Sequence, residues 1–135
     1  VIALMFGTID FQLEMNMNGG YLELLSFRNE IVLASQLAKI QAPVDGVTVD
    51  FKDEDLIQLE TQQAKNLGFS GKLCIHPNQV NHVNQTFNPS SQEITWANQI
   101  MQAVEDAKGQ AISLNGKMID LPVILQEQKI IHRLP

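Results

Sequence analysis

The sequence is poor in cysteine, in basic residues and in long apolar runs, and each scarcity excludes a class of protein. Cys74 is the one cysteine among 135 residues, so an intramolecular disulfide framework is excluded and a reducing compartment is favoured. Lys and Arg total 9 against 15 Asp and Glu, which leaves a formal net charge of −6. Because phosphate binding depends on clustered Lys and Arg, this balance argues against nucleic acid as a partner and against a polybasic membrane anchor.

The apolar runs are too short for a membrane span. The longest, residues 1–6, is far below the roughly 20 residues that cross a bilayer. No basic stretch precedes a longer apolar core, as it does in a signal peptide. We therefore expect no membrane partner and a cytoplasmic location, with an organellar matrix as the alternative. Because the chain opens directly on this strand-like run at Val1, we also expect it to be the C-terminal part of a longer polypeptide.

Residues 1–88 alternate between strand and helix patterns. Buried strands are expected at residues 1–7, 44–51 and 72–75, and helices at 21–40 and 53–67. The second helix begins with acidic residues and stops at Gly68, as helices commonly do. This order predicts parallel βαβ units. Three parallel strands alone would leave two open sheet edges, so the pattern favours one part of a larger sheet.

Residues 89–135 follow a different plan of helix, hairpin and helix. Ser90 stands three residues before Glu93 and predicts a capping box for a helix that continues through residues 94–108. Residues 111–114 and 117–119 are joined through Asn115 and Gly116, which accept the positive φ angles of a type I′ turn. A final helix is expected at residues 121–134, with Pro122 in its first turn.

Two polar residues follow the expected strands of the first part. Asp10 comes just after the first strand, where functional groups of parallel α/β folds gather, and its carboxylate suits Mg²⁺. The alternative is that Asp10 is the N-cap of a following helix. His76 ends the third strand beside Pro77, and it can act as a base or ligand or only bond to neighbouring backbone.

The remaining candidates have weaker patterns. Asp120 stands before Pro122 and locally favours an N-cap of the last helix. Cys74 is interpreted as a strand-core residue, so a Cys–His nucleophilic pair is not expected. The spacing of His76 and His82 does not suit a zinc site. Residues 53–55 are interpreted as a solvated helix start, and no glycine-rich phosphate loop is present.

Three segments resemble one known family. They are residues 6–11 (FGTIDF), 67–79 (LGFSGKLCIHPNQ) and 116–122 (GKMIDLP), and they are similar in order and spacing to motifs of the citrate lyase beta-subunit-like enzymes within the HpcH/HpaI aldolase superfamily. The resemblance implies an α/β (β/α)₈ TIM barrel, of which residues 1–88 are the C-terminal part with about the last three strands. Residues 89–135 would be a C-terminal extension that covers a neighbouring subunit's site.

The resemblance also implies a chemistry. The family's enzymes are Mg²⁺-dependent carbon–carbon lyases that act on coenzyme A or acyl-carrier thioesters, such as citryl-, malyl- or citramalyl-CoA. Asp10 matches one of the two metal-binding acids, and Asp120 matches the catalytic acid of the extension, which donates a proton in a neighbouring subunit. His76 would shape the barrel rim. A homo-oligomer, a trimer or hexamer, is implied.

Part of the family's site has no counterpart in this sequence. The second metal-binding glutamate and the substrate-binding arginine belong to earlier strands, and Ile9 replaces the more usual acid beside Asp10. We therefore expect the chain to be inactive alone. Two alternatives stay open: a non-catalytic half-barrel that assembles with another subunit or with itself, and an aldolase that uses a 2-oxo acid without coenzyme A. The segment around Asp120 favours the coenzyme A branch.

Overall fold

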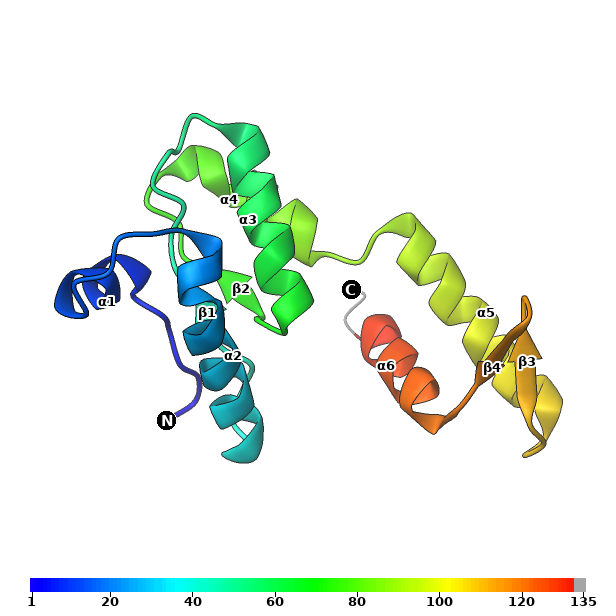
Figure 1. The fold of residues 1–135 in the computed structure, drawn as a ribbon. Helices are drawn as coiled ribbons and strands as arrows, with labels where there is room; N and C mark the ends of the chain where they lie inside the picture. Colours follow the sequence, from blue (N-terminus) through cyan, green and yellow to red (C-terminus); the bar gives the residue numbers. More distant parts are fainter. Residues whose placement is uncertain (133–135) are drawn as a thin grey trace. The chain divides into compact units, whose positions relative to one another are not determined.

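The computed structural model describes residues 1–132 and divides into two compact units, of which the first is Val1–Asn88 and the second begins at Pro89 (Figure 1). The first unit alternates extended segments and helices. The second places a β-hairpin between two helices. None of the helices within residues 1–132 is long and apolar enough to span a bilayer.

The first unit has three parallel extended segments, as the sequence predicts. Residues 2–6 run beside β1 (Val44–Asp45), through the bonds from Val44 N to Leu4 O (2.9 Å) and from Phe6 N to Val44 O (3.0 Å). β1 pairs in turn with β2 (Gly71–Lys72), with Val44 opposite Gly71. The ladders are shorter than expected. Beyond Asp45 the carbonyl groups of Gly46 and Thr48 accept hydrogen bonds from buried side chains instead of a neighbouring strand.

Both helices expected in the first unit are present. They are α2 (Tyr21–Leu37) and α3 (Glu54–Leu67). Asp53 caps α3 by accepting a bond from Leu56 N at 3.0 Å, and Gly68 ends it at a φ of +102°, where a left-handed residue favours glycine.

The first unit contains two further helices, and of these only a helix near Asp10 had been considered, as an alternative. They are α1 (Thr8–Glu14) and α4 (Pro77–Phe87). α1 has only 7 residues, too few to show an apolar period. In α4 the apolar residues Val80, Val83 and Phe87 do follow helical spacing, but this pattern was missed among many Asn and Gln residues. Their position matters for function, because α1 begins just past the first parallel segment and α4 follows the short loop after β2.

The second unit confirms the predicted order of elements. It contains α5 (Ser91–Ala107), β3 (Ile112–Leu114), β4 (Lys117–Ile119) and α6 (Leu121–Ile131). The capping box is formed, with Glu93 N donating to Ser90 Oγ (3.1 Å) and Ser90 N to Glu93 Oε2 (2.7 Å). Asn115 and Gly116 have φ angles of +50° and +75°, as a type I′ turn requires. Residues 133–134 of the expected last helix lie outside the described residues.

One buried acid stands out in the second unit. Glu127 on α6 is 6% exposed, and its Oε2 atom has no hydrogen-bond partner. Burial, together with the nearby carboxylate of Glu93, raises the pKa of Glu127, while a hydrogen bond from Trp96 opposes the shift. The contact between α5 and α6 therefore contains a carboxyl group that is more easily protonated than an ordinary glutamate.

Candidate functional site

Asp10 lies in the first turn of α1, directly past the first parallel segment. Gly7 is the N-cap of α1, so the alternative in which Asp10 caps this helix is wrong. The Asp10 carboxylate is exposed and lies over Gly7, with Oδ2 3.7 Å from the point that a Cβ of Gly7 would occupy. An accessible oxygen donor at this edge fits one ligand position of a hard cation such as Mg²⁺.

Within residues 1–132, no group of three or more His, Cys, Asp or Glu side chains is arranged to hold a metal ion. Asp10 alone therefore does not complete a metal site. Mg²⁺ usually takes one or two carboxylates together with water and substrate oxygens, so an additional carboxylate from another part of the protein would suit such a site.

A cleft of about 570 Å³ opens at the same edge of the first unit. Thr8 and Ile9, which precede Asp10, line one side, and the loop after β1 lines another. The lining side chains combine apolar, aromatic and charged groups, among them Thr8, Ile9, Tyr21, Arg28, Asp45, Val49, Asp50, Phe51, Lys52 and Glu60. A cleft of this size with a few charged groups is typical of a small-molecule site.

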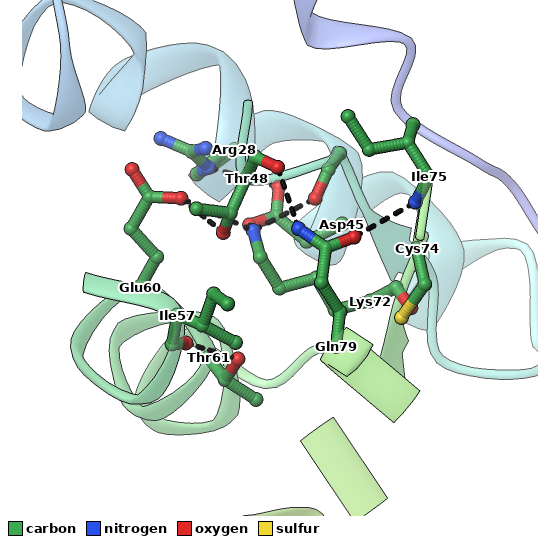
Figure 2. A network of polar contacts seen from close by, with 11 residues as sticks. Arg28, Asp45, Thr48, Ile57, Glu60, Thr61, Lys72, Cys74, Ile75 and Gln79 are labelled. Atoms are coloured by element: carbon green, nitrogen blue, oxygen red, sulfur yellow. Dashed lines mark hydrogen bonds and ion pairs between the residues drawn. The ribbon is translucent and has the colours of Figure 1, made fainter. Parts of the chain in front are cut away.

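A buried chain of alternating charges lies below the loop after β1. Arg28 Nε donates to Asp45 Oδ1 at 2.9 Å, and Lys72 Nζ lies 3.6 Å from Asp45 Oδ2 and 3.7 Å from Glu60 Oε2. Lys72 also donates to the carbonyl of Gly46 at 2.7 Å. Figure 2 shows the Lys72 ammonium group pointing toward Asp45. Helices α2 and α3 are thus connected to both strands through side chains.

The environment of Lys72 affects its protonation. Its side chain is 1% exposed, and this burial lowers the pKa of Lys72, while the carboxylates of Asp45 and Glu60 oppose the shift. The ion pairs and the bond to Gly46 connect β2 to β1 and to α3.

Gln79 joins the loops that follow β1 and β2. It lies in the first turn of α4 and is 1% exposed. Its Oε1 atom accepts bonds from Ile75 N (2.8 Å) and His76 N (3.2 Å), and its Nε2 donates to the carbonyl of Thr48 at 2.7 Å. Figure 2 shows its amide group between Thr48 and Ile75.

His76 serves as the N-cap of α4. Its Nδ1 atom accepts a bond from Asn78 N at 3.2 Å, as the expectation of a bond to neighbouring backbone allowed. The ring stacks on Phe51, with centroids 4.4 Å apart and an interplanar angle of 14°. This stacking therefore fixes the position of the Phe51 ring, which lines the cleft.

Asp120 occupies the N-cap position of α6, as its spacing from Pro122 predicts. Its side chain is exposed and makes no capping hydrogen bond, so the carboxyl group is open to other partners. Met118 and Leu121 beside it are 82% and 64% exposed.

The interpretation of Cys74 as a core residue is wrong. β2 ends at Lys72, so Cys74 lies past the strand with an exposed side chain. Partial burial still raises the pKa of its thiol, an effect that the charge of Lys72 opposes.

Sequence reasoning missed the buried polar residues. Arg28, Asp45 and Lys72 lie in segments that read as apolar helix or strand, and each is nonetheless buried. The sequence could have indicated these residues, because a single charged residue inside an apolar run must be paired if it is buried. Gln79 ends the segment of residues 67–79 that resembles the family, but it received no role.

Comparisons with known proteins identify the family. The family model described as HpcH/HpaI aldolase/citrate lyase matches residues 1–77, which is more than half of the chain. The chain belongs to this family, as the three sequence segments predicted.

Individual relatives agree with this membership. The mitochondrial citramalyl-CoA lyase of Rattus norvegicus is 35% identical over 96% of this chain, and the citrate lyase subunit beta of Leuconostoc mesenteroides subsp. cremoris is 40% identical over 80%. The chain spans 39% and 36% of the lengths of these two proteins.

A solved structure of the CitE protein of Mycobacterium tuberculosis, in complex with magnesium, acetoacetate and coenzyme A, is also similar. It shares 26% sequence identity at a TM-score of 0.84, and the alignment covers 98% of this chain and 51% of that one.

Proposed function

We propose that this chain forms the C-terminal part of a Mg²⁺-dependent carbon–carbon lyase that cleaves a coenzyme A or acyl-carrier thioester of a hydroxy acid, such as citryl-, malyl- or citramalyl-CoA. The observation that carries the proposal is family membership over residues 1–77, a match that includes both Asp10 and the segment through Pro77. The similarity to a citramalyl-CoA lyase and to a citrate lyase beta subunit supports this class of substrate.

In this proposal the first unit is part of a (β/α)₈ barrel. The three parallel segments would be about the last three barrel strands, and residues 89–135 would be the extension. The parallel pairing of residues 2–6, β1 and β2 supports this arrangement. A barrel of this type normally needs about 250 residues, so earlier strands would come from a longer polypeptide.

Asp10 would be one of the ligands of Mg²⁺. Its exposed carboxylate at the carboxyl end of a parallel segment supports this role, and the CitE structure with magnesium supports the choice of cation. When bound, the ion supplies positive charge that stabilises oxygen anions. Asp10 contributes a fixed negative oxygen held by the first turn of a helix.

Asp120 would supply the proton of the reaction. Cleavage of a β-hydroxy thioester breaks the bond between its α and β carbons and releases the hydroxyl proton as the 2-oxo group forms. It leaves a 2-oxo acid and the enolate of acetyl-CoA, whose carbon must be protonated. The Asp120 carboxyl group makes no capping bond, and Met118 and Leu121 nearby are exposed apolar residues, which supports a role on another surface. We propose that this surface is the site of a neighbouring subunit in a trimer or hexamer. The expected compartment remains the cytoplasm, although the rat relative is named as mitochondrial.

The test is a product assay on the intact protein that contains this chain, after its mass has been measured. We expect acetyl-CoA to be released together with pyruvate, glyoxylate or oxaloacetate from citramalyl-, malyl- or citryl-CoA, and EDTA to stop the release. The isolated 135 residues are expected to be inactive. Tight stoichiometric Mg²⁺ binding by the isolated chain would contradict the view that it holds only part of the metal site.

A second candidate is a non-catalytic half-barrel that assembles with another subunit or with itself. The apolar side chains of the first parallel segment favour it, because Val1, Ile2 and Met5 are 95%, 73% and 67% exposed. The mass in solution distinguishes the two proposals. A self-assembling chain would elute as a multiple of 15.1 kDa without lyase activity, whereas the lyase would elute as a multiple of its longer polypeptide and would cleave the thioester.

A further inference from the structure

The Gln79 amide group is buried and its hydrogen bonds are directed to two different loops. The oxygen accepts from Ile75 N and His76 N, which belong to the loop after β2. The nitrogen donates to the Thr48 carbonyl, which belongs to the loop after β1. Since a buried carbonyl without a partner costs free energy, this arrangement fixes the position of Thr48 relative to α4.

The loop that Gln79 holds forms a wall of the cleft. Thr48 is 2% exposed and is held from its other side by the bond from its Oγ1 to Glu60 Oε2 (2.5 Å). The residues that follow it, from Val49 to Lys52, line the cleft. The Phe51 ring then stacks on His76, so the same two loops are joined a second time at the surface.

We propose that Gln79 is a positioning residue for the substrate cleft. It acts through the Thr48 carbonyl by holding residues 49–52 in place, and it does not itself contact substrate. The inference rests on the proposed function only in that the cleft is taken to receive the thioester. The position of the loop can be tested without any activity.

The change Gln79→Glu tests this idea with little change of shape. One carboxylate oxygen can still accept from Ile75 N and His76 N, but the other faces the Thr48 carbonyl as a second acceptor. Burial and the facing Thr48 carbonyl disfavour the ionised form, so this oxygen becomes protonated at the acid end of the pH range, and protonation restores a donor to Thr48. The variant should therefore resemble the wild type at low pH and lose function as pH rises.

Other titratable groups surround the position. They are Asp45 on β1, Lys72 on β2, Glu60 on α3 and His76 before α4. All of them are retained in every variant, so comparison with the wild type at each pH removes their own contributions. Gln85→Glu is the matched control, because it makes the same chemical change at an exposed position of the same helix.

The experiment measures kcat and KM for wild type, Gln79→Glu, Gln79→Met and Gln85→Glu in the intact protein, from about pH 5.5 to about pH 9. For Gln79→Glu we expect a KM within about twofold of wild type at the acid end and roughly tenfold higher at the alkaline end, as for one lost hydrogen bond. Gln79→Met should show the increase at every pH, and Gln85→Glu should match wild type throughout.

Ring-current shifts of the His76 ring protons, caused by the stacked Phe51, report the loop position independently of activity. They should differ from wild type in Gln79→Glu at alkaline pH and return toward it at acid pH. If the wild type cleaves no thioester, the proposed function fails while this readout still tests the positioning. Unchanged shifts, a KM loss that does not depend on pH, an unchanged KM in an active enzyme, or unfolding of both Gln79 variants would overturn the inference.

Discussion

The Thr8 side chain lies directly against Gly46, so closely that no side chain fits at Gly46. A Cβ at that position would lie 2.6 Å from Thr8 Cγ2 and 2.9 Å from the Phe6 carbonyl oxygen. Thr8 stands two residues before Asp10, and Gly46 begins the loop whose later residues line the cleft. The contact therefore sets the distance between the turn that carries Asp10 and the loop after β1.

Gly46→Ala should destabilise the protein by about 1–3 kcal/mol, because the new methyl group pushes the Thr8 side chain and the Phe6 backbone away from position 46. Gly71→Ala is the control on the neighbouring strand. Its Cβ would meet the methyl groups of Val44 at 3.9 Å, which is ordinary contact distance. Chemical denaturation of both variants measures the difference, and equal losses would contradict this account.

Asp45→Ala should reduce stability by about 3–5 kcal/mol, because it leaves the buried charges of Arg28 and Lys72 without their shared partner. Asp55→Ala, at an exposed position in the first turn of α3, should cost less than about 1 kcal/mol. Urea unfolding monitored by circular dichroism compares the two. A cost at Asp45 no larger than that at Asp55 would show that the buried charges are not coupled.

Glu127→Gln should remove a pH dependence from the second unit. Because the folded-state pKa of Glu127 is raised, the folded state binds more protons than the unfolded state. The contribution of Glu127 to the stability of this unit is therefore fully present below the ordinary pKa of 4.5. It is lost as the pH rises through the raised folded-state pKa. The variant should match wild type in acid and become relatively more stable toward neutral pH.

Fluorescence of Trp96, the single tryptophan, follows unfolding of this unit. Glu105→Gln makes the same change at an exposed position of α5 and should leave the pH dependence of wild type intact. A Glu127→Gln variant whose stability varies with pH as the wild type does would show that Glu127 is not the responsible group.

Asp120→Asn should lower kcat of the intact enzyme by about 10²–10⁴-fold, as expected when a general acid is removed, with a much smaller effect on KM. The melting temperature should stay near that of wild type, because the side chain makes no hydrogen bond in the N-cap position. The matched control is Asp106→Asn, an exposed acid at the end of α5. An unchanged kcat in Asp120→Asn would remove Asp120 from the mechanism.

Local patterns in the sequence were sufficient to predict the second unit almost completely. The Ser90–Glu93 capping box, the Asn115–Gly116 turn and Pro122 each act within a few residues, so their structural consequences can be read without knowledge of the fold.

The first unit was less predictable because its contacts join distant segments. The three parallel segments were recognised by their apolar character, but their lengths depend on side chains such as Lys72 and Gln79 that take over backbone carbonyls 26 and 31 residues away. Asp10 was found from its place after a strand. Two partners of Gln79, the backbone N–H groups of Ile75 and His76, lie within four residues, whereas the Thr48 carbonyl lies 31 residues away and no local pattern reveals it.

The most direct test of the central claim compares Mg²⁺-dependent acetyl-CoA release by wild type, Asp10→Asn and Glu14→Gln in the intact protein. Glu14 is an exposed acid on the same short helix and serves as the matched control. We expect Asp10→Asn to need about 100-fold more Mg²⁺ or to be inactive, and Glu14→Gln to behave as wild type. An Asp10→Asn enzyme with the Mg²⁺ dependence and rate of wild type would contradict the assignment of Asp10, and with it the account of this site.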